Sequence, residues 1–242
     1  HAGEKVGVIF PTFDEYPNRL SDSQIVPYVC DNEDFSYTAD DLMTFFADKN
    51  ISLLLLINPD NPSGHFMAKA DVLRLAKWCE KRGVNLLLDE SFVDFADVTV
   101  DNSLLHNDIL ESYPHLMVMK CISKSYGVPG LRLGVFASSD KALIARIRKE
   151  VSIWNINSFA EFYLQIYGKY ENDYKRACEK FIAERETFYE ELKSIPYLRV
   201  FPSKANYFMC EVIDKYTSAE LTQRLIDNDV LISNCGLKRN MS

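Results

Sequence analysis

Long apolar runs, cysteine pairs and histidine clusters are all missing from this sequence. The longest apolar run, residues 53–57, is far too short to cross a bilayer, and the first residues have neither the basic start nor the apolar stretch of a signal peptide. No C-x-x-C pair occurs, so we expect reduced thiols, no metal site and a cytoplasmic protein. The cysteines are Cys30, Cys79, Cys121, Cys178, Cys210 and Cys235.

Basic charge is also scarce. The chain has 27 Lys and Arg against 35 Asp and Glu, a formal net charge of −8, and no basic tract interleaved with aromatics. This composition argues against nucleic acid or an anionic membrane as a partner, so any bound anion needs a local basic pocket. With 242 residues, 47% of them hydrophobic, the chain can form one large domain and a smaller appendage.

Short apolar runs alternate with helical patterns along the first part of the chain. The runs are continuous, which is typical of strands buried on both faces of a parallel sheet. A T-x-x-D cap opens a predicted helix over residues 38–49, and Gly83 ends another over 68–82. We therefore expect an α/β large domain with a mainly parallel sheet flanked by helices. The predicted strands are residues 6–10, 53–57, 86–88, 116–119 and 133–137.

The pattern changes after residue 140 to long helical segments and then to a short strand-helix unit with Thr217 as a helix N-cap. We expect a cofactor-binding large domain over residues 1–150, a connecting helix over 151–172 and a small α+β domain over 173–242. We expect both domains to be incomplete at the chain ends, because the chain opens almost at once on a strand and closes on a polar segment. The predicted elements are helices 141–151, 159–170, 174–193 and 218–228 and strands 198–201 and 206–212.

Two polar motifs follow predicted strands, at the sheet edge where ligands bind in such folds. INPDNPSG, residues 57–64, carries Asn61, whose amide can donate and accept, although the motif also suits a rigid βα loop. LLLDESFVDF, residues 86–95, places Asp89 at the end of a strand. A carboxylate with limited solvent needs a cation or several donors, and a helix cap or a structural ion pair would also satisfy it.

A third motif, CISKSYGVPGLRLG, follows the strand at 116–119 and suits a surface loop or a cofactor site. Lys124 offers an amine that forms a Schiff base with an aldehyde, Arg132 a planar fork for a phosphate, and Ser123 a hydroxyl. Together the three motifs supply the groups that pyridoxal 5'-phosphate (PLP) requires: an amine, a phosphate clamp, a carboxylate and an amide. A dinucleotide-binding site is a weaker alternative, because GVPGLRLG does not open a helix after the first strand as such a fingerprint must.

With PTFDEY, residues 11–16, these motifs resemble the fold-type I, class I/II aminotransferase family of PLP enzymes, in its histidinol-phosphate aminotransferase and threonine-phosphate decarboxylase branch. The resemblance implies the role of each group. Lys124 would bind the cofactor and move the proton at Cα, Asp89 would pair with the pyridine nitrogen, and Asn61 would contact the phenolic oxygen. Arg132 and Ser123 would hold the phosphate. Phe13, rather than Tyr16, would stack on the ring, with core packing as the alternative role.

The sequence departs from this family at several points. Phe92 stands where many members have tyrosine, as the decarboxylase branch tolerates, and Cys121 replaces a small hydroxyl residue or glycine three positions before the lysine. The family's N-terminal glycine-containing loop and its C-terminal carboxylate-binding arginine are not visible. We interpret Arg239 as an exposed loop charge.

These patterns favour a PLP-dependent aminotransferase that moves an amino group from an anionic amino acid to a 2-oxo acid. A PLP-dependent decarboxylase of a phosphorylated amino acid is the alternative within enzymes, and an inactive fragment that keeps the fold is the alternative outside them. The resemblance also implies a homodimer. The sequence does not select the amino-acid substrate.

Overall fold

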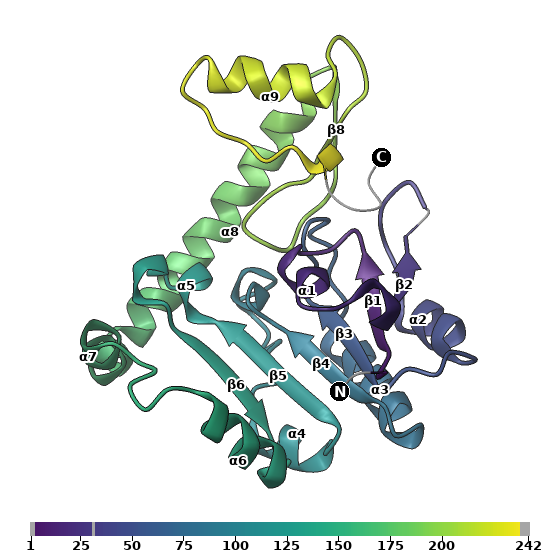
Figure 1. The fold of residues 1–242 in the computed structure, drawn as a ribbon. Coiled ribbons are helices and arrows are strands. Elements are labelled where there is room, and N and C mark those ends of the chain that lie inside the picture. The colour runs from purple at the N-terminus through teal and green to yellow at the C-terminus, as the bar shows by residue number, and fades with distance from the viewer. Residues whose placement is uncertain (1–2, 31, 238–242) are drawn as a thin grey trace.

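The fold is described for residues 3–30 and 32–237 of a computed structural model. It contains a six-stranded sheet in the order β2-β1-β3-β4-β5-β6 (Figure 1). The first five strands run parallel and β6 is antiparallel to β5, so the expected mainly parallel α/β sheet is confirmed. The strands are β1 Val6–Phe10, β2 Ile25–Val29, β3 Leu53–Ile57, β4 Asn85–Asp89, β5 Leu116–Cys121 and β6 Gly134–Ser138.

One face of the sheet carries the main apolar core, to which α2 (Ala39–Phe46) and α3 (Lys69–Lys81) contribute. Gly7 of β1 permits this packing, because a Cβ there would lie 2.8 Å from the Phe46 ring. Thr38 caps α2 in a reciprocal capping box with Asp41, as its T-x-x-D motif predicts. Gly83, with φ +67°, follows α3 in the left-handed conformation that ends many helices.

Two edge strands differ from the sequence-based expectation. Residues 133–137 were expected to form a buried parallel strand, and this is wrong: β6 is antiparallel, and its five residues are exposed or half-buried. Within the described residues β6 pairs with β5 alone, so one of its edges has no neighbouring strand. β2 was not anticipated, because Pro27 interrupts its pattern. Among the residues described here it pairs with β1 alone, and such an edge strand tolerates a residue without an N–H.

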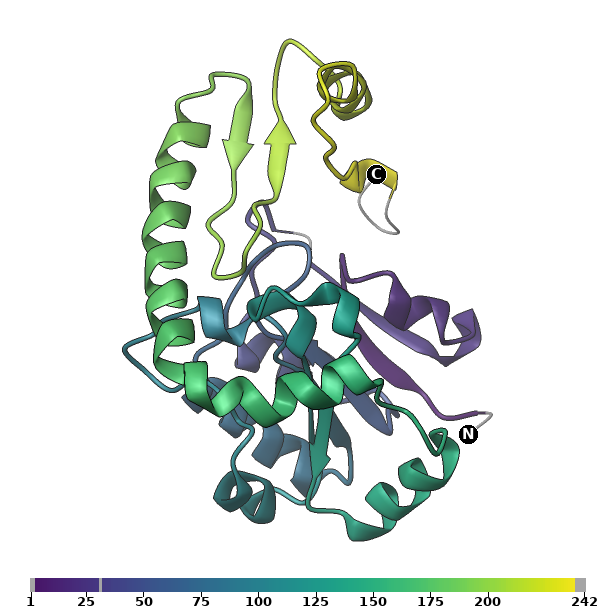
Figure 2. The same ribbon diagram turned by 90° about the vertical axis from the view of Figure 1, so that its left-hand side faces the viewer.

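The second half of the chain is mainly helical: α6 Lys141–Glu150, α7 Ser158–Tyr167 and α8 Glu171–Lys193. Residues 151–172, predicted to form a connecting helix, contain α7 and a 3-10 turn, Gly168–Tyr170, that leads into α8. Figure 2 shows α8 rising along one side of the molecule toward β7 (Leu198–Val200), β8 (Cys210–Val212) and α9 (Ser218–Ile226). Thr217 caps α9 as predicted.

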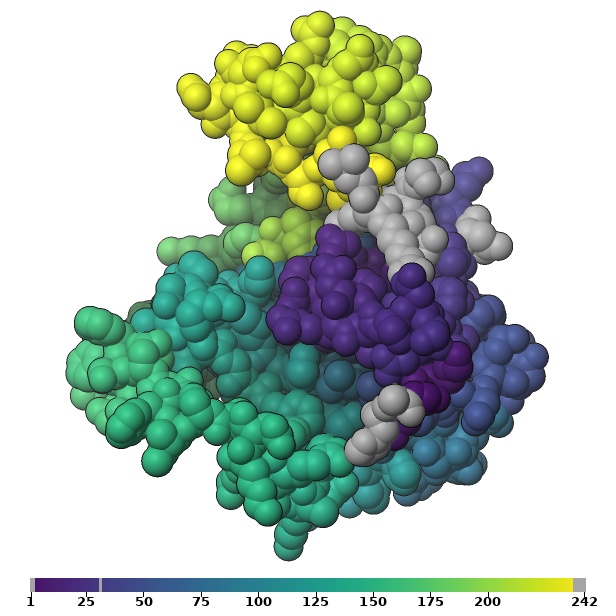
Figure 3. Space-filling view, viewed as in Figure 1, coloured from purple at the N-terminus to yellow at the C-terminus, as the bar shows by residue number. Residues whose placement is uncertain are grey.

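The C-terminal elements form a lobe above the large sheet (Figure 3). Arg185 of α8 fastens this lobe, since its Nη1 donates to the carbonyl oxygens of Phe95 (2.6 Å) and Ala205 (3.2 Å). The remaining short elements are α1 Glu15–Asn18, α4 Asn107–Ser112, α5 Ile122–Ser125 and the 3-10 turns Asp22–Gln24, Val93–Phe95, Pro129–Leu131 and Cys235–Leu237. No helix in the described part of the chain is long and apolar enough to span a bilayer.

Candidate active site

The predicted site residues gather at the carboxyl ends of four neighbouring strands. Phe13 follows β1, Asn61 follows β3, Asp89 is the last residue of β4, and Lys124 comes three residues after β5. The strand order reverses between β1 and β3, which is the kind of position where open α/β sheets bind ligands. The fold therefore brings to one sheet edge groups that lie far apart in sequence.

Asp89 is half-buried and held through both carboxylate oxygens. Its Oδ1 accepts from the backbone N–H of Ser91 at 2.9 Å and from the Ser91 hydroxyl, and its Oδ2 accepts from the Tyr16 hydroxyl. Burial, and then the charge of Asp89, raise the pKa of Tyr16 above its ordinary value, so its hydroxyl stays protonated and acts as a donor. Three donors thus satisfy a carboxylate that the sequence placed at this edge.

Lys124 and Ser123 lie on α5 and differ in exposure. Lys124 is exposed, and its Nζ lies 6.0 Å from the centroid of the Phe92 ring. Ser123 is 5% exposed, and its buried Oγ has no hydrogen-bond partner among the described residues. Buried hydroxyls are nearly always paired, so an unpartnered one beside Lys124 is a donor available to a ligand.

Arg132 follows the 3-10 turn Pro129–Leu131 in a left-handed conformation, with φ +56°. Its guanidinium is exposed and donates from Nη1 to the carbonyl oxygen of Pro129 at 3.2 Å. It forms no ion pair with any described residue, which leaves its other N–H groups available to an anion. Arg132 lies two residues before β6.

Asn61 and Phe13 lie in the loops that follow β3 and β1. Asn61 is half-buried in a loop fixed by two hydrogen bonds between Asn58 and the backbone of Met67, 2.8 and 2.9 Å long. Phe13 is 43% exposed, and its ring packs edge-on against Tyr16 with centroids 6.1 Å apart. Tyr16, rather than Phe13, is the aromatic in contact with Asp89, and the stacking role of Phe13 stays a prediction.

Sequence reasoning missed two contributors to this site. Ser91 binds Asp89, and a serine two residues after a strand-ending aspartate is a recognisable turn signal. Tyr207 comes from the connection between β7 and β8, packs its ring on Phe92 at 5.1 Å and donates to the carbonyl oxygen of Asp60 at 2.6 Å. No local pattern indicates this second contact, because it depends on how the C-terminal lobe folds back.

Comparison with known proteins decides the family. The model of the family "Aminotransferase class I and II" matches residues 1–238. The chain belongs to this family. It is 29% identical to the threonine-phosphate decarboxylase of Salmonella typhimurium over 94% of the chain and 61% of that protein. It is 27% identical to the histidinol-phosphate aminotransferase of Ruminiclostridium cellulolyticum, over 95% of the chain and 62% of that protein.

A solved structure gives the same result. The structure of a decarboxylase from Sulfurospirillum multivorans superimposes with a TM-score of 0.87 at 27% identity, over 98% of this chain and 68% of that one. The chain therefore has the fold of PLP-dependent transferases. It spans about six tenths of the length of the two curated relatives.

Class I and II aminotransferases use pyridoxal phosphate, and the described residues fit this cofactor. The unpartnered Ser123 hydroxyl and the unpaired Arg132 guanidinium suit a phosphate, and the anchored Asp89 suits a protonated ring nitrogen. Lys124 supplies an exposed amine that suits the aldehyde. Each residue's role remains a prediction.

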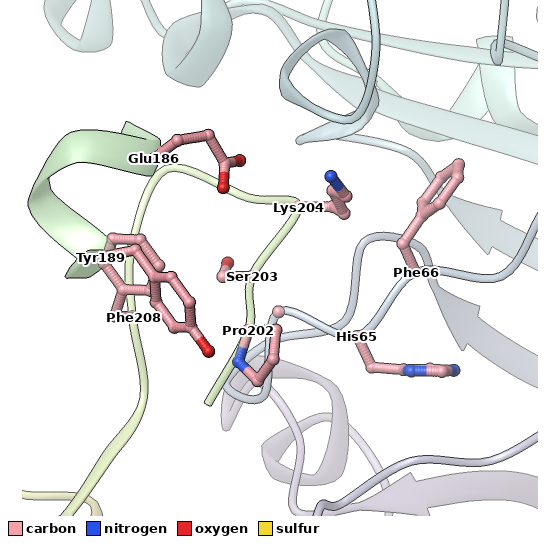
Figure 4. Close-up of a pocket in the computed structure, with 9 residues that line it drawn as sticks. His65, Phe66, Glu186, Tyr189, Pro202, Ser203, Lys204 and Phe208 are labelled. Atoms are coloured by element: carbon pink, nitrogen blue, oxygen red, sulfur yellow. The ribbon is translucent and has the colours of Figure 1, made fainter. Parts of the chain in front are cut away.

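A cavity of about 230 Å³ lies elsewhere, between the loop after β3 and the C-terminal lobe (Figure 4). None of the predicted site residues lines it. It is distinct from the candidate site, which is an open sheet edge. Its lining residues are Gly64, His65, Phe66, Glu186, Tyr189, Pro202, Ser203, Lys204 and Phe208.

Proposed function

We propose that this chain forms the core of a PLP-dependent aminotransferase that takes an amino group from an anionic amino acid and passes it to a 2-oxo acid. The observation that supports this most directly is the shared sheet edge, where Lys124, Asp89 and the unpartnered Ser123 hydroxyl follow adjacent strands. These are the groups that PLP requires at its aldehyde, ring nitrogen and phosphate.

When bound, the cofactor supplies an electron-withdrawing ring that makes the substrate's Cα–H acidic. Asp89 would hold the proton on the ring nitrogen, and its two hydrogen-bonded oxygens keep the carboxylate oriented for this. Asn61 would donate to the phenolic oxygen, and Ser123 and Arg132 would bind the phosphate. Lys124 would supply the amine that holds the aldehyde, and its Nζ, once the substrate's amino group has taken its place, would remove the proton from the substrate's Cα and return it to the cofactor.

Decarboxylation of a phosphorylated amino acid is the second candidate, and Phe92 favours it. The Phe92 ring is 6% exposed and lies beside the Lys124 Nζ, so it adds apolar surface and no hydroxyl at that point. The threonine-phosphate decarboxylase relative supports the same reading. In this reaction Lys124 would deliver a proton to Cα after carbon dioxide leaves, instead of removing one from it.

We further propose a homodimer in the cytoplasm, with amino acids and 2-oxo acids as its small-molecule partners. A set of exposed apolar residues on α7 and in the segment before it supports self-association, since monomers rarely expose extensive apolar surface. We call it the α7 apolar surface. It consists of Val151, Ile153, Trp154, Ile156, Phe159, Phe162 and Leu164, each at least 43% exposed.

Titration of the purified chain with PLP tests the proposal. We expect a visible absorbance band that Lys124→Ala abolishes and that the control Lys149→Ala, at an exposed lysine of α6, retains. A panel of amino acids, including phosphorylated ones, then separates the reactions. Release of a 2-oxo acid identifies transamination, and release of carbon dioxide identifies decarboxylation. A wild-type chain without the band would instead be an inactive fragment.

A further inference from the structure

Ser91 joins the two strands that carry the principal site residues. Its side chain is buried, at 7% exposed, and its hydroxyl donates to Oδ1 of Asp89 at the end of β4. The same Oγ accepts from the backbone N–H of Cys121, the last residue of β5, at 2.9 Å. One hydroxyl group therefore contacts both the predicted ring-nitrogen carboxylate and the backbone three residues before Lys124.

The direction of both hydrogen bonds is fixed by chemistry. A backbone N–H can only donate, so the Ser91 oxygen must accept from Cys121 and its single proton is left for Asp89. Tyr16 holds the other carboxylate oxygen of Asp89. The carboxylate therefore cannot rotate without breaking a hydrogen bond at each oxygen.

The hydrogen bond between Cys121 and Ser91 lies just beyond the point where backbone pairing between β4 and β5 ends. The parallel register between β4 and β5 ends at Asp89 opposite Met119, and the Glu90 N–H donates to the Met119 carbonyl at 2.9 Å. Beyond this point a side chain takes over from the backbone, because the Cys121 N–H donates to the Ser91 hydroxyl. Without that hydroxyl, the segment leading into α5 loses a direct bond to the end of β4.

We propose that Ser91 is a positioning residue that sets the distance between Asp89 and the Lys124 segment, so that both reach opposite sides of the cofactor together. This inference rests on the proposed function, because it needs PLP to be the ligand that spans the two groups. It adds a residue that the resemblance did not assign and that acts only through its two neighbours.

The test compares Ser91→Ala and Ser91→Thr with a matched control, Ser103→Ala. Ser103 also donates its hydroxyl to a buried carboxylate, that of Glu90, so the control removes the same kind of bond one residue away. In the cofactor-free chain we expect Ser91→Ala to speed amide hydrogen exchange at Cys121 about tenfold, because a protected amide loses its acceptor. Ser91→Thr keeps exchange near the wild-type rate, and Ser103→Ala does not change it.

Equilibrium titration with PLP gives the second readout. Ser91→Ala should raise the dissociation constant about tenfold, Ser91→Thr should restore it to within about threefold, and Ser103→Ala should leave it within about twofold. Unchanged exchange or unchanged PLP affinity in Ser91→Ala overturns the proposal, as does an equal loss of PLP affinity in Ser103→Ala. Failure of the wild-type chain to bind PLP overturns the proposed function instead, and exchange at Cys121 still decides whether Ser91 joins the strands.

Discussion

The hydroxyl of Tyr16 donates a hydrogen bond to Oδ2 of Asp89, although 73 residues separate the two along the chain. Tyr16 lies on α1, the helix that follows β1 in the chain, and Asp89 ends β4, two strands away across β3. A contact over this distance fixes α1 against the sheet edge. The same hydrogen bond orients the Asp89 carboxylate in the chain without a ligand.

Tyr16→Phe is expected to destabilise the cofactor-free chain by about 1–2 kcal/mol, because a half-buried carboxylate loses one of its donors. Urea unfolding measures the loss as a lower midpoint at unchanged slope. Tyr170→Phe, at a ring 56% exposed, serves as the control and should stay within about 0.5 kcal/mol of the wild type. Equal effects in both variants would mean that the Asp89 contact contributes nothing measurable.

Arg132→Gly separates phosphate binding from stability. Arg132 has φ +56°, a conformation that costs a non-glycine residue about 1 kcal/mol or more, so glycine should leave the stability of the cofactor-free chain unchanged or raise it. The affinity for PLP should fall at least about tenfold, because a charged phosphate partner is lost. The affinity for pyridoxal, which has no phosphate, should stay within about twofold. A parallel loss for both ligands would contradict the assigned role.

Local patterns predicted most elements of the fold. Thr38, Thr217 and Gly83 act through their own neighbours in sequence, and the helix starts and end that they predict are found. The strand at β6 was predicted but its exposure and antiparallel direction were not, since a continuous apolar run does not reveal whether a strand has neighbours on both sides. Pro27 concealed β2 for a related reason, because its tolerance depends on the strand lying at an edge.

The site was predictable only in part. Asp89, Asn61 and Lys124 follow apolar runs, so the rule that parallel strands end at one edge was enough to bring them together. The contact of Tyr16 with Asp89 and that of Tyr207 with Phe92 were not predictable, because each depends on tertiary packing between distant segments. Sequence spacing carries no information about such contacts.

The pH dependence of stability should reveal the raised pKa of Asp60. Burial raises the pKa of Asp60 to about 6 from an ordinary value of 3.8, despite hydrogen bonds from Ser63 that lower it. A raised carboxyl pKa means that the folded chain holds the proton more tightly than the unfolded chain. The stabilising contribution of the Asp60 proton is therefore full below about pH 4 and is lost as the pH rises through 6.

Asp60→Asn mimics the protonated form. We expect its free energy of unfolding to gain about 2 kcal/mol relative to the wild type between pH 4 and pH 7, because only the wild type loses a proton there. Urea unfolding of both proteins at several pH values gives this difference, in which the effects of all other carboxyl groups cancel. A difference that stays constant over this range would show that Asp60 titrates normally.

Arg185 should contribute strongly to stability through its two carbonyl contacts. The residue is 4% exposed, so Arg185→Met leaves the carbonyl oxygens of Phe95 and Ala205 without this donor and should cost about 2–4 kcal/mol. Arg176→Met, on the same helix but with a side chain 63% exposed, is the control and should cost under about 0.5 kcal/mol. Chemical denaturation compares the two, and similar costs would show that the buried contacts are dispensable.

Trp154→Glu tests self-association through the α7 apolar surface. Trp154 and Ile153 are each 87% exposed and Phe159 is 79% exposed, so a charge at this point should remain hydrated in a monomer but be costly in an interface. We expect light scattering after size exclusion to show a wild-type dimer and a Trp154→Glu monomer with an unchanged unfolding midpoint at low concentration. Asn172→Glu adds the same charge at an exposed position on α8 and should leave the dimer intact. A wild-type monomer, or a Trp154→Glu dimer, would show that this surface does not pair two copies of the chain.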